Sequence, residues 1–143
     1  MKIKQLSIFI ENKEGRLAEI TKILSSNDIN IRALSLADTT NFGILRLIVS
    51  KPEKALTVLK DAGFTVSITE VLALLLDDKV GALSKALILL TENGVQVEYV
   101  YAFIGGDAKK AYVVLRVENN EDAIKLLKES NYELLSQSEI ENI

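Results

Sequence analysis

Two hydrophobic periods alternate along the first half of the chain. Residues 6–10 place an apolar side chain at every second position, the period of a half-buried strand, whereas residues 16–26 space leucine and isoleucine three or four apart, the period of an amphipathic helix. Residues 52–63 begin with proline and end with glycine, as helices often do. The pattern predicts the order strand, helix, strand, strand, helix, strand, at residues 6–10, 16–26, 29–37, 44–50, 52–63 and 64–69.

The second half of the chain repeats this pattern. At an offset of 66 positions, residues 12–31 align with residues 78–97, and Gly15 falls on Gly81. At an offset of 68, residues 43–64 align with residues 111–132, which places a two-residue insertion between Tyr99 and Ala111. The second copy therefore predicts strands at 72–76, 95–101, 112–117 and 132–135, and helices at 82–91 and 121–130.

This element order predicts an α+β fold of two tandem βαββαβ units with the ferredoxin-like arrangement. Each unit has an antiparallel four-stranded sheet with both helices on one face, and the proposed domain limits are residues 1–69 and 70–143. The non-core face of the second sheet is too apolar for exposure to water. Either the two copies or two chains bury it, and we expect a homodimer. Its predicted residues are Val71, Ala73, Leu75, Val100, Ala102, Tyr112 and Val114.

Composition narrows the function by exclusion. The 143 residues are 48% hydrophobic and contain no cysteine or histidine, which removes thiolate chemistry and the commonest general base and metal ligand. The net charge of −3 disfavours nucleic acid. No apolar run is long enough for a signal peptide or a membrane span. We expect a cytoplasmic protein without cofactor, metal, nucleic-acid or membrane partner.

The segments around the two aligned glycines resemble the ACT domain, a small regulatory module of amino-acid metabolism. The family pattern is an acidic or Asn residue, a gap, a glycine, a leucine that opens the first helix, and later an Asn-Ile pair in the second strand. The first copy supplies Asn12, Gly15, Leu17, Asn30 and Ile31; the second copy supplies Asp78, Gly81, Leu83, Gln96 and Val97. Neither glycine follows the proline that is common in the family.

The resemblance implies a non-catalytic regulator that binds a free amino acid where the first strand turns into the first helix, at an interface with a neighbouring unit or protomer. Free N–H groups at a helix start can receive a carboxylate, and a glycine lets the ligand approach them. A partner enzyme or regulator would respond. The predicted ligand-binding residues are Asn12, Glu14, Gly15, Arg16, Leu17 and Asn30, and more weakly Asp78, Gly81 and Gln96.

Simpler roles and other functions compete with this interpretation. Both glycines fit ordinary turns, Leu17 fits the core, and Asp77 with Asp78 fits a cap of the helix at 82–91. One alternative function is an adaptor that keeps the ACT fold, has lost the ligand and mediates protein–protein association. An acylphosphatase is disfavoured although Arg16 and Asn30 are present, because its phosphate loop is not visible in the sequence.

Overall fold

A computed structural model describes residues 1–103 and 105–143 of the chain. Contacts within the chain divide it into two units. The first unit is Lys4–Thr69 with Asn142, and the second unit is Glu70–Glu141 with Met1–Ile3 and Ile143. The predicted insertion falls in a stretch that includes Ile104, which lies outside the described residues.

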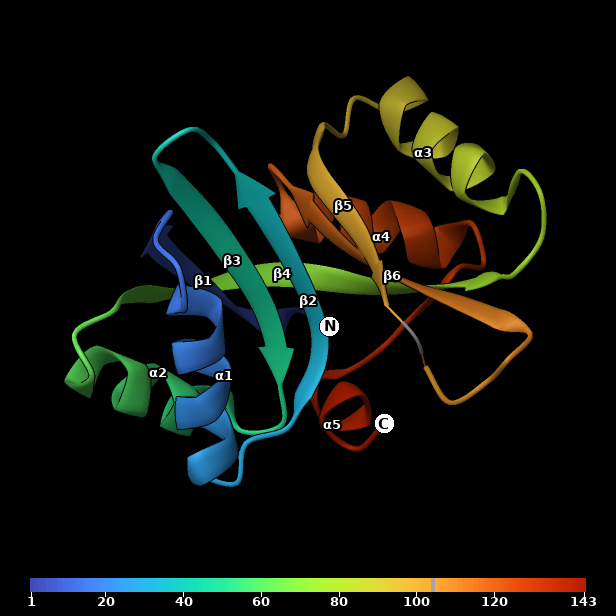
Figure 1. Cartoon of the computed structure of the whole chain (residues 1–143). Coiled ribbons are helices and arrows are strands. Elements are labelled where there is room, and N and C mark those ends of the chain that lie inside the picture. The colour runs from blue at the N-terminus through green and yellow to red at the C-terminus, as the bar shows by residue number, and fades with distance from the viewer. Residues whose placement is uncertain (104) are drawn as a thin grey trace. The chain divides into compact units, whose positions relative to one another are not determined.

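The first unit is an antiparallel sheet with two helices on one face (Figure 1). Strand β3 lies between β1 and β2, and the hydrogen-bonded order is β2-β3-β1-β4. Leucine, isoleucine and valine side chains from the strands and from α1 and α2 form its core. The elements are β1 (Ile3–Glu11), α1 (Arg16–Ser26), β2 (Ile31–Asp38), β3 (Phe42–Val49), α2 (Pro52–Asp61) and the first part of β4 (Thr65–Asp77).

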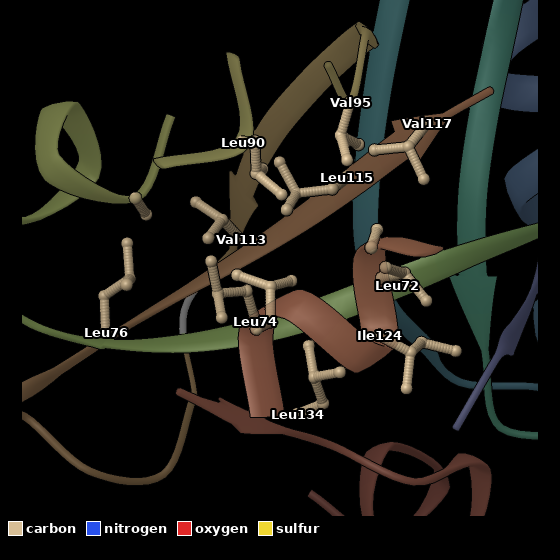
Figure 2. Close-up of a cluster of buried hydrophobic side chains, with 13 residues drawn as sticks. Leu72, Leu74, Leu76, Leu90, Val95, Val113, Leu115, Val117, Ile124 and Leu134 are labelled. Carbon is tan, nitrogen blue, oxygen red and sulfur yellow. The ribbon is translucent and has the colours of Figure 1, made fainter. Parts of the chain in front are cut away.

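The second unit repeats this architecture. Strand β6 pairs antiparallel with β4 and β5, and β7 pairs with β4, so the order is again the ferredoxin-like one. Its core gathers around Leu74, Leu90 and Leu115, which Figure 2 shows pointing toward one another. The elements are the second part of β4, α3 (Ala82–Glu92), β5 (Val97–Phe103), β6 (Lys110–Val117), α4 (Asn120–Glu129), β7 (Glu133–Leu134) and α5 (Gln137–Glu141).

The predicted fold class is confirmed. Besides shifts of strand ends, three of its elements differ from the prediction for reasons visible in the sequence. Strand β4 is one strand of 13 residues where two were predicted, because no glycine or proline interrupts it. Helix α2 ends at Asp61, before Gly63, whose φ of +92° is left-handed. Helix α5 was not predicted, since five residues are too few to display a helical period.

The apolar face predicted for the second sheet is largely buried. Val71, Ala73 and Val114 are each 0% exposed, whereas Val100 keeps 37% of its surface exposed. Burial on both faces explains why β4 reads as the nearly continuous apolar run VLALLL rather than as strict alternation.

The core of the second unit generates a stability prediction. Leu74→Ala removes a fully buried side chain from β4 and should lower the free energy of unfolding by about 3 kcal/mol. Leu83→Ala is the matched control, because Leu83 is 38% exposed on α3. This substitution should lower the free energy of unfolding by less than about 1 kcal/mol. Urea unfolding of both variants measures the difference; equal losses would contradict the core assignment.

Candidate ligand site at the first helix turn

A left-handed glycine connects β1 to α1. Gly15 has φ +83° and ψ −4°, and its carbonyl accepts a hydrogen bond from the Glu19 N–H at 2.9 Å. No side chain caps the helix. Within the described part of the chain, no group accepts a hydrogen bond from the N–H of Leu17 or Ala18. These two N–H groups, at the positive end of the helix dipole, can therefore bind an anion.

The turn before α3 has the same backbone. Gly81 has φ +87° and ψ −8°, and its carbonyl accepts from the Lys85 N–H at 3.0 Å. The hydrogen bond from the Asn12 N–H to the Asn41 carbonyl recurs between the Asp78 N–H and the Lys109 carbonyl, both at 2.9 Å. The two turns therefore differ in their side chains and not in their main chain.

The predicted cap by Asp77 and Asp78 is wrong. The residue that caps α3 is Gly81, and it makes no side-chain hydrogen bond to the helix. Asp77 ends β4, where its carboxylate pairs with the Lys110 ammonium at 2.7 Å. That hydrogen bond lowers the pKa of Asp77 and raises the pKa of Lys110. The cap fails because both aspartates precede the helix by too many residues to reach its first N–H groups.

A cavity of about 110 Å³ lies beside the Gly15 turn. Of the six stronger candidates, Asn12, Arg16 and Leu17 line it, whereas Glu14 and Gly15 lie in the turn outside the lining. The remaining lining comes from β1, the turn, β2 and β3: Ile10, Glu11, Lys13, Leu36, Asp38 and Gly43.

Opposite charges meet in this cavity. The Arg16 guanidinium pairs with the Glu19 carboxylate at 3.0 Å and keeps further donors available. The Asp38 carboxylate has no partner among the described residues. A hydrogen bond from Lys13 satisfies Glu11 and holds its pKa below the ordinary value. Arg16 and Asp38 are therefore the cation and the anion that remain for a ligand with both charges.

Asn12 and Leu17 have roles that differ from those expected. The Asn12 amide donates to the Thr39 and Thr40 carbonyls at 3.4 and 3.3 Å, so it ties the β1–α1 turn to the β2–β3 turn. Leu17 is 38% exposed, so the prediction that it belongs to the core is wrong. It lines the cavity together with Leu36 instead of packing into the interior of the unit.

The structure places Asn30 away from the Gly15 turn in the first unit. Asn30 directly precedes β2, at the opposite end of α1, where its main chain exchanges two hydrogen bonds of 2.9 Å with Ser50. Gln96 likewise precedes β5, and its carbonyl accepts from the Glu118 N–H at 3.3 Å. In the second unit Gln96 and Gly81 lie at opposite ends of α3.

Sequence reasoning missed Asp38. Strand pairing brings it to the cavity: Asp38 pairs with Gly43, and Gly43 pairs with Ile10 at the end of β1. A side chain at Gly43 would stand 3.3 Å from the Ala37 carbonyl, so the glycine keeps this corner open. The available signal was a carboxylate directly after an apolar strand, but its neighbours depend on a register that one sequence does not display.

The described residues contain no helix that is long and apolar enough to cross a membrane. Over the same residues, no group of three or more acidic side chains is arranged to hold a metal ion.

Comparison with known proteins identifies the family. A family model described as an ACT domain pair matches residues 1–143. The chain belongs to the ACT domain family. Protein BT0572 from Bacteroides thetaiotaomicron has a solved structure that is 45% identical, with a TM-score of 0.94 over 100% of this chain and 98% of that chain. No curated protein matches this ACT domain pair.

More distant solved structures share the fold. The ligand-free regulatory subunit of aspartate kinase from Thermus thermophilus is 14% identical, with a TM-score of 0.62 over 88% of this ACT domain pair and 91% of that chain. E. coli aspartokinase III in complex with lysine and aspartate is 17% identical, with a TM-score of 0.51 over 90% of this chain and 31% of that chain. At these identities the likeness establishes the fold of the ACT pair and no more.

The two glycine turns give a matched prediction. Gly15→Ala and Gly81→Ala should each cost about 1 kcal/mol, because alanine is disfavoured in the left-handed region although its Cβ would meet no atom within 4 Å. Gly106→Ala is the control: it has the same open surroundings, and its φ lies outside that region. Thermal unfolding compares the stability of the three variants. If Gly106→Ala lowers the stability as much as the other two substitutions, the left-handed backbone is not the cause of the losses.

Proposed function

We propose that this ACT domain pair is a non-catalytic regulatory protein that binds a free amino acid beside the Gly15 turn. One observation carries the proposal: Arg16 and Asp38 line the same small cavity, next to the unpartnered N–H groups of Leu17 and Ala18. A free amino acid carries a carboxylate and an ammonium on neighbouring atoms, so it needs donors and an acceptor in one place.

Each end of the ligand has a partner in this scheme. The carboxylate accepts hydrogen bonds from the N–H groups of Leu17 and Ala18 and from the Arg16 guanidinium. The ammonium donates to the Asp38 carboxylate. The cavity of about 110 Å³ has the volume of roughly four water molecules, which favours an amino acid with a small side chain.

The first copy is the preferred site, and Asn30 completes it from another protomer. Asn30 lies at the other end of α1 in its own unit, so in this proposal it contacts the ligand from a second protomer. Glu14 and Gly15 shape the turn. Asp78, Gly81 and Gln96 repeat the backbone framework in the second copy. Membership of the ACT family supports regulation of a partner enzyme or regulator.

Binding should depend on both charges of the cavity. In a thermal-shift panel of the twenty amino acids, we expect at least one small amino acid to raise Tm by several degrees, since a ligand at 100 times its Kd stabilises the native state by about 2.7 kcal/mol. Arg16→Gln and Asp38→Asn should each abolish that shift. Lys22→Gln, an exposed change elsewhere on α1, should leave it unchanged.

A flat panel with the wild-type protein would reject the amino-acid proposal and favour the ligand-free adaptor. Loss of the shift in the Lys22→Gln control would reject the assignment of the site to Arg16 and Asp38, because net charge alone would then explain the effect.

We also propose that the protein forms a homodimer through an aromatic patch on the first unit. Phe9 and Phe42 stack with ring centroids 4.9 Å apart, and Ile44 pairs with Phe9 on the adjacent strand. All three are exposed, by 46%, 43% and 39%. An exposed cluster of large apolar side chains marks an interaction surface more often than isolated ones do.

Dimerisation should weaken when this patch becomes polar. Phe42→Ser should shift the protein toward monomer in sedimentation velocity at micromolar concentration. Val80→Ser is the control, because Val80 is fully exposed in a turn of the second unit, and its replacement should leave the sedimentation coefficient unchanged. A monomeric wild type, or a dimer that Phe42→Ser does not weaken, would disprove the assigned interface.

A further inference from the structure

A second hollow lies in the second unit, along α3. It has a volume of about 560 Å³ and lies between α3, the end of β4, Lys110 and the turn from α4 to β7. The cavity beside Gly15 is lined by the corresponding strand end and turn of the first unit, but it also reaches β2 and β3, whereas this hollow extends along α3 to Glu92. We call the larger hollow the α3 groove.

Most charges at one end of the α3 groove neutralise one another. Asp77 accepts from Lys110 at 2.7 Å and lies 3.9 Å from Lys79. Glu133 adds an attraction to Lys110. Two charged side chains in the lining remain: neither the Lys85 ammonium nor the Glu92 carboxylate has a partner in the described part of the chain.

These two charges are arranged along one face of α3. Lys85 and Glu92 are seven residues apart, which is two helical turns and roughly 10 Å along the axis. Ile88 and Leu89 line the groove between them, and Ile88 is 52% exposed. The groove therefore offers a cation at one end, an anion at the other and an apolar floor in the middle.

The arrangement is not a by-product of the repeat. At the offset of 66 positions, Lys85 aligns with Glu19, Ile88 with Lys22 and Glu92 with Ser26. Glu19 is engaged by Arg16 and Ser26 is uncharged, so the first copy lacks the two opposite isolated charges. The backbone of the unit does not require Lys85 or Glu92.

We propose that the α3 groove is a second ligand site, which takes a linear amino acid whose carboxylate and distal ammonium are separated by an aliphatic chain. The carboxylate pairs with Lys85, the ammonium pairs with Glu92, and the chain lies on Ile88 and Leu89. This proposal is independent of the amino-acid site beside Gly15, because its residues, its unit and its ligand class are different.

Isothermal titration calorimetry with ε-aminocaproate tests the ligand class. This probe has the two end charges and the chain but no α-ammonium. We expect saturable binding with a Kd of about 1 mM or tighter. Caproate lacks the ammonium and pentylamine lacks the carboxylate, and each should bind more weakly by up to about fivefold, the upper range for one exposed ion pair.

Charge reversal tests the two named residues. Lys85→Glu and Glu92→Lys should each weaken ε-aminocaproate binding by about fivefold or more. The double variant should restore it, because the probe can turn end to end in a groove of reversed polarity. Lys125→Gln changes an exposed lysine on α4 outside the groove and should leave the Kd unchanged.

Three results would overturn the proposal: no binding of ε-aminocaproate, binding of caproate or pentylamine as tight as that of ε-aminocaproate, or a double variant that binds no better than the single variants. Arg16→Gln separates the two sites. It should leave the Kd for ε-aminocaproate unchanged while it removes the response to a small amino acid. A panel in which no small amino acid raises Tm, together with intact ε-aminocaproate binding, would reject only the site beside Gly15.

Discussion

The left-handed glycine between a strand and the following helix is the constraint on which both units depend. Gly15 and Gly81 turn the chain sharply at the end of β1 and of β4, and each directly precedes a helix that no side chain caps. A capping serine or aspartate would have satisfied some of the first N–H groups itself. The glycine leaves these groups facing outward, so one local conformation fixes the helix direction and also provides donors.

The two copies share the main chain of the turn and differ in the side chains around it. The main-chain hydrogen bonds of the two turns match, yet Arg16 follows Gly15 whereas Ala82 follows Gly81. On the helices, Glu19 pairs with Arg16 in the first unit, while Lys85 at the position aligned with Glu19 has no partner among the described residues. A duplicated fold can therefore offer two differently charged hollows without any change in topology.

Sequence periodicity was sufficient to predict the helices and strands, but it was insufficient to predict which residues meet at the candidate site. The repeat predicted both glycine turns and the ferredoxin-like order, because these depend on local patterns. Asp38 reaches the cavity only through the register of β2 on β3 and of β3 on β1, which is a non-local property. Asn30 is separated from Gly15 within its unit by the length of α1, although the motif joins the two residues in sequence.

The aligned positions also concealed the α3 groove. An alignment draws attention to matches such as Gly15 with Gly81, whereas Lys85 and Glu92 are mismatches and read as an ordinary solvated helix face. Their significance depends on the hollow beside them and on the pairing of Asp77 with Lys110, which removes the competing charges. Neither the hollow nor this ion pair can be predicted from the spacing of residues along the helix.

Exposed N–H groups contribute little net binding energy by themselves, since a ligand must displace the water that already solvates them. Two turns with the same main chain therefore cannot differ in affinity or in specificity through the glycine. The difference must come from charged side chains that meet the ligand in a partly enclosed space, where water screens the interaction less. Beside Gly15 we propose that these are Arg16 and Asp38, which line one cavity of about 110 Å³ and would discriminate a compact zwitterion from a simple anion. Gly81 has the donors without such a pair in its own turn. In this proposal the glycine turn allows a ligand to approach the helix start, whereas the side chains around the turn determine whether a ligand binds there.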